Sequence, residues 1–190
     1  MRRLLIIGAA AVLAANAVYA NEWHVYSSDV DGMTGNQQLT NAFTNAQAGD
    51  TITIHAGTYN LTTEEMMFRY ASAADGTLYP TVGTCLTSSV DNLTVRGDPA
   101  ASRDDIILSG LGSNAATADG QHAIMRLTGA NCTVRHLTFY KGTANTGTLY
   151  INGSKVGDAW AYRRGGGLVL STSGVCEDCV FDSCYAGQGA

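Results

Sequence analysis

The chain has 190 residues, including 22 glycines and only 2 prolines, and 14% of its residues are charged. This composition favours short strands joined by tight turns over a bundle of helices. The formal net charge of −5 argues against nucleic acids and anionic membranes as partners.

The first 20 residues have the features of a secretory signal peptide. Met1, Arg2 and Arg3 form a basic start, residues 4–15 are mostly apolar, and Ala20 is a small residue suited to cleavage. The apolar stretch is shorter than the roughly 20 residues that a membrane-spanning helix needs. We predict cleavage after Ala20. The remaining domain, residues 21–190, is expected to be exported and to be extracellular, on the cell surface or in the periplasm. Loss of Arg2 and Arg3 takes its net charge from −5 to −7.

The next segments predict a strand, a helix and a second strand. Residues 23–26 alternate as in a short strand. Residues 36–48 predict an amphipathic helix that ends at Gly49 as its C-cap, with one apolar face formed by Leu39, Ala42, Phe43 and Ala46. Residues 51–55 alternate at period two and predict a strand, and residues 56–59 predict a turn.

Repeats follow in the second half of the chain. Residues 92–96 match residues 131–135 in four of five positions, 39 residues later. A looser copy follows: the spacing of Val134, Leu137 and Phe139 recurs 42 residues later in Cys176, Cys179 and Phe181. Such repeats predict coils that stack on one another. We expect the interior of the stack to contain Val134, Leu137, Phe139, Cys179 and Phe181.

These patterns together predict an all-β fold, a right-handed parallel β-helix with a short N-terminal capping helix. The helix would cover the apolar interior and the free strand edges of the first coil. Residues 98–105, 112–121 and 143–165 predict protruding loops, where binding surfaces usually form. No polar cap follows Cys184, so we expect this segment to be the N-terminal part of a longer protein.

The sequence also resembles known families. LTNAFTNAQAGDTITIHAGTY (residues 39–59) is similar to the first coil of secreted proteins of the pectate-lyase-like superfamily. GGGLVLSTSGVCEDCVFDSCYAGQGA (residues 165–190) is similar to the repeats of polymorphic outer-membrane proteins. The resemblance implies a parallel β-helix on the cell surface or outside the cell. It also implies that any lyase residues come from later coils, so no catalytic residue is assigned here.

The five cysteines allow three interpretations. Cys85, Cys132, Cys176, Cys179 and Cys184 all follow the export signal, and an oxidising compartment permits disulfides. The repeat alignment instead places Cys176 and Cys179 where Val134 and Leu137 lie, which favours thiols stacked inside the solenoid. A metal or redox site at Cys176 and Cys179 is the least favoured, because no second ligand pair follows.

Other polar residues suggest chemistry less specifically. His24, His55, His122 and His136 lack metal-ligand spacing and are predicted to be structural or surface residues. Asn60, Asn92, Asn131 and Asn152 begin sequons, although Asn at the start of a repeat also allows an amide ladder between coils.

Basic residues are the candidates for contact with acidic sugars. Arg96 and Arg135 are predicted to stack on adjacent coils, and Lys141, Lys155, Arg163 and Arg164 lie near the predicted loops. A solvated outer face is the alternative for all of them. Asp104 and Asp105 are either a solvated turn or, in a loop, ligands for Ca²⁺ together with backbone carbonyls.

Two functions are expected. The first is an exported or cell-surface protein that binds a polysaccharide, a cell-surface glycan or another surface partner, without catalysis in this segment. The alternative is a polysaccharide lyase or another carbohydrate-active enzyme of the pectate-lyase-like superfamily. Apart from Ca²⁺ in a lyase, no cofactor or metal is assigned, and the mature segment is predicted to contain no transmembrane span.

Overall fold

The computed structural model describes residues 20–61, 70–72, 78–80, 84–110, 123–144, 148–151, 154–158 and 166–186. These residues are mostly β-strands, with a single α-helix among them, and most of the strands pair in parallel. Residues 1–19 of the predicted signal peptide, the predicted loop 112–121, His122, Asn152, Arg163 and Arg164 lie outside the described residues.

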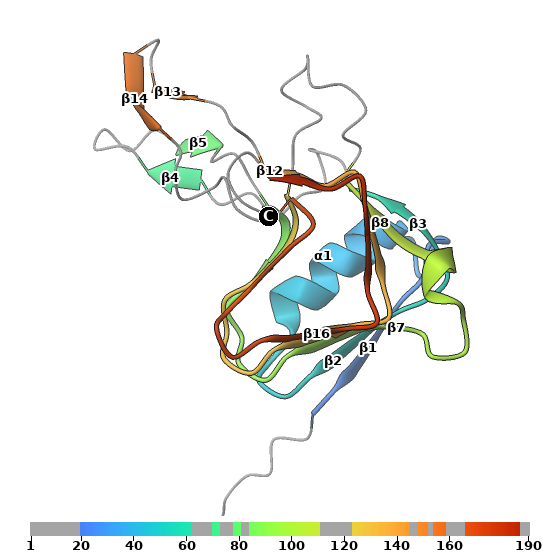
Figure 1. Cartoon of the computed structure of the whole chain (residues 1–190). Helices are drawn as coiled ribbons and strands as arrows, with labels where there is room; N and C mark the ends of the chain where they lie inside the picture. Colours follow the sequence, from blue (N-terminus) through green and yellow to red (C-terminus); the bar gives the residue numbers. More distant parts are fainter. Residues whose placement is uncertain are drawn as a thin grey trace, which may run out of the picture.

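Three parallel sheets are built by successive passes of the chain. Sheet A contains β1 (Glu22–Val25), β2 (Thr51–Ile54), β7 (Thr94–Gly97), β10 (Thr133–Arg135) and β16 (Val175–Glu177). Sheet B contains β3 (Gly57–Asn60), β8 (Ile106–Ser109), β11 (Thr138–Tyr140) and β17 (Val180–Asp182). Sheet C contains β6 (Thr84–Ser88), β9 (Ala123–Leu127) and β15 (Leu168–Leu170). Figure 1 looks along the stack, in which the three sheets form the sides of a triangle.

The remaining strands form shorter pairs. The parallel pair is β12 (Thr143–Ala144) with β18 (Tyr185–Ala186). The two antiparallel hairpins are β4 (Tyr70–Ser72) with β5 (Leu78–Pro80), and β13 (Thr148–Ile151) with β14 (Ser154–Asp158). Each hairpin lies in the chain between a strand of sheet B and the next strand of sheet C. Parallel strands of one sheet end at the same edge, so both hairpins leave the stack from the same corner, as Figure 1 shows.

The four passes are named coil 1 (residues 51–88), coil 2 (94–127), coil 3 (133–170) and coil 4 (175–186). Their register confirms the predicted repeats. In sheet A, Val95 pairs with Val134, which pairs with Cys176. In sheet B, Phe139 pairs with Phe181. Residues spaced 39 or 42 positions apart in the sequence therefore lie side by side in the stack.

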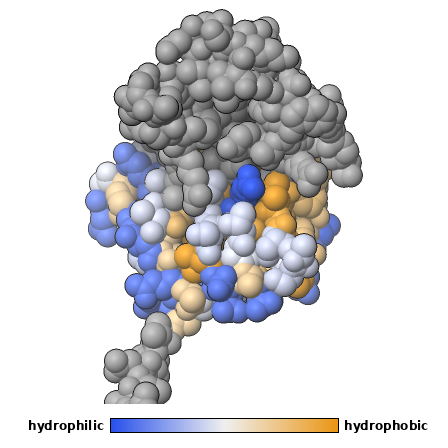
Figure 2. Space-filling model, turned by 90° about the vertical axis from the view of Figure 1, so that its left-hand side faces the viewer, coloured by the Kyte–Doolittle hydropathy of each residue, from blue (hydrophilic) through white to orange (hydrophobic). Residues whose placement is uncertain are grey.

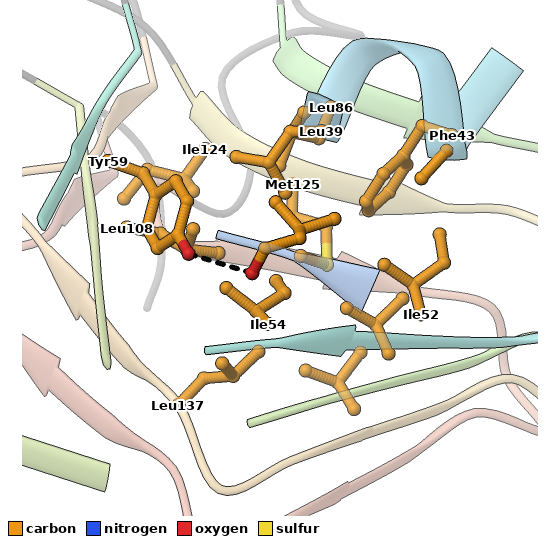
Figure 3. Packing of buried hydrophobic residues seen from close by; sticks show 14 of the residues in the cluster. Leu39, Phe43, Ile52, Ile54, Tyr59, Leu86, Leu108, Ile124, Met125 and Leu137 are labelled. Atoms are coloured by element: carbon orange, nitrogen blue, oxygen red, sulfur yellow. Dashed lines mark hydrogen bonds between the residues drawn. The ribbon is translucent and has the colours of Figure 1, made fainter. Parts of the chain in front are cut away.

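The core lies between the three sheets and α1. Ile52, Val95 and Val134 of sheet A are fully buried, and Leu108 and Phe139 of sheet B are buried with them. Figure 3 shows residues of these sheets, of sheet C and of α1 in one cluster. On the flank shown in Figure 2, the coloured surface mixes hydrophilic and hydrophobic residues without one continuous hydrophobic area.

Helix α1 (Gly35–Asn45) covers the first coil, as the sequence predicts. It begins with a capping box, in which Thr34 and Gln37 satisfy each other's backbone N–H groups. The helix contacts β1, β3 and β6, one strand from each sheet. Leu39 and Phe43 are buried in the same cluster as Ile52 and Ile54 (Figure 3).

Two predicted boundaries are wrong. The helix ends with Ala46 as its C-cap, because Ala46 takes an extended conformation (ψ 142°), and Gly49 lies in the following turn with φ +91°. Residues 57–59 are not a turn but the start of β3, so the corner between sheets A and B is only His55 and Ala56. The register explains the short corner, because Gly57 pairs directly with Ile106 in sheet B.

The predicted interior is confirmed for coil 3 and only partly for coil 4. Val134, Leu137 and Phe139 are fully buried, whereas Cys179 is half-buried and Phe181 is 48% exposed. The reason is position in the stack: β11 has a partner strand on each side, but β17 is the last strand of sheet B. Phe181 lies parallel to Phe139, with 5.0 Å between ring centroids.

Within the part of the chain that the structure describes, no helix combines the length and the apolar character that crossing a membrane requires.

Candidate functional site

The outer face of sheet A carries two columns of polar residues. Its strands alternate, so the neighbours of the buried Ile52, Val95 and Val134 point away from the core. The first column runs through Thr51, Thr94 and Thr133, with Glu22 before them and Val175 after them. The second column runs through His24, Thr53, Arg96, Arg135 and Glu177.

A small ionic network fixes the beginning of this face. The Arg96 guanidinium lies 2.7 Å from a Glu22 carboxylate oxygen, and its Nε donates to the Thr53 hydroxyl at 3.0 Å. Thr53 in turn donates to Glu22 at 2.8 Å. The hydrogen bonds from Thr53 and Arg96 lower the pKa of Glu22. Arg96 is therefore already neutralised by Glu22.

Arg135, the next residue in the column, is exposed. Unlike Arg96, it makes no ion pair with any residue that the structure describes. Of the two stacked arginines predicted from the sequence, Arg135 is the one whose charge is available to a ligand.

A hydrogen-bonded row of three side chains crosses the first strands at the corner between sheets A and B. Asp98 Oδ2 lies 2.7 Å from His55 Nδ1, and His55 Nε2 lies 3.1 Å from His24 Nδ1. If His55 donates to Asp98, its Nε2 accepts from His24 Nδ1–H, and the lone pair of His24 Nε2 is left unused within the row. The hydrogen bond from the Ala100 backbone N–H, followed by that with His55, lowers the pKa of Asp98.

Tyr26 holds the middle imidazole from one side. Its ring lies parallel to the His55 ring, with 4.1 Å between centroids and 3° between planes. Tyr26 is 39% exposed. The corner thus combines an accessible aromatic ring with two imidazoles.

A second carboxylate–imidazole pair lies at the same corner on coils 3 and 4. His136 Nδ1 is 2.6 Å from Asp178 Oδ2, and His136 Nε2 is 2.9 Å from the carbonyl oxygen of Ala101. Both contacts place an acceptor at a ring nitrogen, so both favour the doubly protonated imidazolium. Accordingly the hydrogen bonds to Ala101 and then to Asp178 raise the pKa of His136. The Arg103 guanidinium binds the other oxygen of Asp178.

The loop 98–105 brings Ala101 and Arg103 to this pair. This loop contains a short 3-10 helix, Arg103–Asp105. Gly97, which precedes the loop, lies against His136, because a Cβ there would overlap the His136 carbonyl oxygen. The close approach of the two coils at this corner therefore requires glycine.

The cysteines mostly follow the interior arrangement. Cys132 is fully buried, while Cys179 and Cys184 are half-buried, and their thiols donate to backbone carbonyls of Val90, Glu177 and Phe139. Burial raises the pKa of all three thiols, that of Cys179 to about 12. Cys176 is exposed because β16 is the last strand of sheet A. These four cysteines are free, and the side chain of Cys85 lies outside the described residues.

The remaining candidate residues lie at separate places in the fold. Asn131 donates to the side chain of Asn92 at 3.3 Å, which confirms the amide ladder. Lys141 lies 4.9 Å from the centre of the Tyr140 ring, and Lys155 lies on β14 with its side chain outside the described residues. Asp104 and Asp105 are exposed, and Arg103 lies beside Asp104.

Clusters of three or more possible metal ligands are absent from the described residues. In the described ranges, no three or more His, Cys, Asp or Glu side chains are arranged to hold a metal ion. This includes the pair Asp104 and Asp105, which has no further acidic ligand among those residues.

Sequence reasoning missed the rows of histidine and aspartate. The partners are 31, 43 and 42 residues apart, so no local spacing reveals them. The repeat alignment contains the signal, because Tyr26, His55 and Asp98 each follow a sheet A strand at the same position. An alignment extended by one residue beyond each strand places these three side chains next to one another.

No protein-family model, no curated protein and no solved structure matches this chain.

Proposed function

We propose that this chain is an exported right-handed parallel β-helix of the pectate-lyase-like kind, and that it binds an acidic glycan on the outer face of sheet A without catalysing a reaction. The observation that carries the proposal is the pair of in-register columns. Hydroxyl groups of Thr51, Thr94 and Thr133 run beside the cationic residues Arg96 and Arg135.

The columns suit a linear polymer. Neighbouring parallel strands lie about 4.8 Å apart, so coils 1 to 3 offer a threonine hydroxyl at a constant step. A glycan chain that lies along these coils would meet Thr51, Thr94 and Thr133 in turn, with Arg96 and Arg135 beside the last two. Coil 4 ends this surface, because Val175 and Glu177 take the equivalent positions. Because Arg135 has no ion pair with a described residue, it can bind a sugar carboxylate through two parallel hydrogen bonds.

The aromatic ring of Tyr26 extends this surface at the corner. It is partly exposed and is held in place by His55. A rigid ring with a polar tip suits a ligand that has both apolar C–H faces and hydroxyl groups. The negative charge of the whole protein disfavours acidic polymers at other places, so binding should concentrate where Arg135 lies.

Binding to immobilised pectate, alginate and chondroitin sulfate, with a neutral glucan for comparison, tests the proposal. We expect binding to at least one acidic polymer, weakened by added salt because the contact is ionic and exposed. Arg135→Ala should reduce affinity about tenfold or more, the size of one hydrogen bond to a charged group. Arg126→Ala is the matched control, because Arg126 lies on β9 of sheet C. Equal losses for the two variants, or no binding to any polymer, would contradict the proposal.

A polysaccharide lyase is the alternative, favoured by the His24 nitrogen that the hydrogen-bonded row leaves unused. His24 pairs with Thr53, and Arg96 lies one strand further along sheet A. A lyase needs a base and a cation near the reacting carbon. Its product is an unsaturated sugar that absorbs ultraviolet light. We expect residues 21–190 to release none from the three acidic polymers. Product formation that His24→Ala abolishes would favour the enzyme over the binding protein.

A further inference from the structure

We propose that His24 and His55 form a binding site for a divalent late transition-metal ion, of the class Cu²⁺, Ni²⁺ or Zn²⁺. The ion replaces the proton that the two imidazoles share. The inference does not depend on glycan binding, because it rests on the geometry of the histidine pair alone.

The nitrogen positions are close to those of two ligands on one metal. His24 Nδ1 and His55 Nε2 are 3.1 Å apart, and the ring centroids are 5.3 Å apart with 27° between the planes. The rings thus meet nitrogen to nitrogen, edge to edge. With zinc–nitrogen bonds of 2.0–2.1 Å in tetrahedral geometry, two ligand nitrogens lie about 3.3 Å apart. A few tenths of an ångström and a rotation of each ring bring the pair to that geometry.

Asp98 supplies the outer contact that metal-binding histidines usually have. Its carboxylate binds His55 Nδ1 at 2.7 Å, on the opposite side of the ring from Nε2. A carboxylate in this position fixes the orientation of the ring and makes the ligand nitrogen more basic. The parallel Tyr26 ring restricts the same imidazole from its face.

Two paired strands position the ligands. His24 lies on β1 opposite Thr53 of β2, and His55 directly follows β2, where its backbone N–H donates to Val25 at 2.8 Å. Ligands on paired strands lose little freedom on binding, in contrast to ligands on two mobile loops. The ion would join β1, which is an edge strand of sheet A, to its neighbour.

The ligand set selects the class of metal. Two neutral imidazoles suit copper, nickel and zinc, whereas Ca²⁺ and Mg²⁺ require oxygen ligands. The nearby Glu22 carboxylate is held by Thr53 and Arg96. No third protein ligand completes a set among the described residues, so water fills the other positions. Among these metals, Cu²⁺ should bind most tightly.

Titration of the purified protein, without an affinity tag, with CuCl₂ and separately with ZnCl₂ tests the site. We expect one ion per chain at micromolar concentrations, a copper electron paramagnetic resonance spectrum with two nitrogen ligands, and a higher Tm in the presence of the metal. Asp98→Asn should weaken binding at least tenfold, because it removes the carboxylate behind His55.

Three further variants make the test specific. His24→Ala and His55→Ala should each abolish the two-nitrogen spectrum, and circular dichroism checks that both variants are folded. His55→Ala also separates this pair from a site formed by the chain's amino terminus and His24. His136→Asn is the control, since both nitrogens of His136 are already occupied. Unchanged copper binding in His55→Ala, or binding only at millimolar concentrations, would overturn the proposal.

Discussion

At the scale of single residues, Phe139 and Phe181 have the same chemistry in different surroundings. They are paired in register, but Phe139 is fully buried and Phe181 is 48% exposed. Phe139→Ala should lower the free energy of unfolding by about 3–5 kcal/mol, because it leaves a cavity in a closed core. Phe181→Ala should cost about 1 kcal/mol, because water already reaches the ring. Urea denaturation of both variants measures the difference. Equal losses would mean that coil 4 is covered in the protein.

The pair of His136 and Asp178 should make stability depend on pH. Hydrogen bonds raise the pKa of His136 above its ordinary 6.5 and lower that of Asp178 below its ordinary 3.8. A raised imidazole pKa gives stability that is complete below about pH 6.5 and is lost as pH rises through the folded value. A lowered carboxyl pKa gives stability that is complete above about pH 4 and is lost as pH falls through the folded value. The pair therefore contributes most at about pH 5.

Unfolding in urea at several pH values, with Asp178→Asn compared to the original protein, measures this contribution. The stability difference should be largest near pH 5 and smaller at pH 9, where the bond from Arg103 to Asp178 remains. Asp182→Asn is the control, because Asp182 lies on the same coil and its carboxylate accepts only from the Ser183 hydroxyl among the described residues. A difference that does not vary between pH 5 and pH 9 would show that His136 stays neutral.

The sequence predicted the inward residues of the strands better than the polar corner residues. Val134 and Leu137 are apolar and recur at a fixed spacing, so the repeat alone places them in the core. His55 and Asp98 differ in chemistry although they occupy equivalent positions, and a search for similar residues therefore does not connect them. Their contact depends on the register between coils, which only the fold determines.

At the scale of elements, α1 serves as the cover of the first coil. Its apolar side chains enter the core, and it contacts one strand of each sheet. Phe43→Asp should cost more than the roughly 3–5 kcal/mol of a Phe→Ala change, because it also buries a charge without a partner. Asn41→Asp, on the exposed face, should change stability little and keeps the oxygen that accepts from Asn45.

Removal of residues 21–48 tests the same idea more strongly. Without α1 and β1, the first coil would expose both apolar interior and unpaired strand edges, which template aggregation. The truncated protein should therefore form large species in size-exclusion chromatography. A truncated protein that elutes as a monomer with an unchanged β-rich circular dichroism spectrum would show that α1 covers nothing.

The loop 98–105 makes contacts with other coils that its amino-acid composition does not predict. The sequence predicted a protrusion there, but the loop lies along the corner and contacts three other coils. Asp98 binds His55 of coil 1, the Arg103 carbonyl accepts from Thr138 of coil 3, and the Arg103 side chain binds Asp178 of coil 4. The composition of a loop indicates that it is exposed. These contacts instead depend on the register between coils, which brings residues of different coils together.

At the scale of the whole molecule, stability is a sum over neighbouring coils, because each coil contacts mainly the one before and the one after. The two ends of the stack therefore differ from its middle. At one end α1 covers the interior, and at the other end Val175, Cys176 and Phe181 are exposed among the described residues. The stacking order could be predicted from the repeat spacing, but the hairpins β4–β5 and β13–β14 could not, since they break the repeat.

At the end of the stack that α1 covers, a buried carboxylate binds the backbone nitrogen of Asn21. Asp50 is fully buried and accepts hydrogen bonds from the backbone N–H groups of Asn21 and Gln47 and from the Trp23 indole. Burial by itself would raise the pKa of Asp50, but these hydrogen bonds outweigh it and lower the pKa. The predicted cleavage after Ala20 would turn the Asn21 nitrogen, 2.7 Å from Asp50, into a charged amino terminus.

We therefore expect the protein that starts at Asn21 to be more stable than one that keeps Ala20 before it. The ammonium group gains a buried partner, and a hydrogen bond between charged groups contributes about 1.5–3 kcal/mol. An amino terminus titrates near pH 8 when unfolded, and Asp50 would raise that pKa in the folded protein. The advantage should thus be complete below about pH 7 and disappear as pH rises through the folded value. Urea denaturation at pH 6 and pH 10 measures it, with the chemically acetylated protein as the matched control, and sequencing of exported protein locates the natural start. Equal stability of the two forms at pH 6 would show that Asp50 does not bind the new terminus.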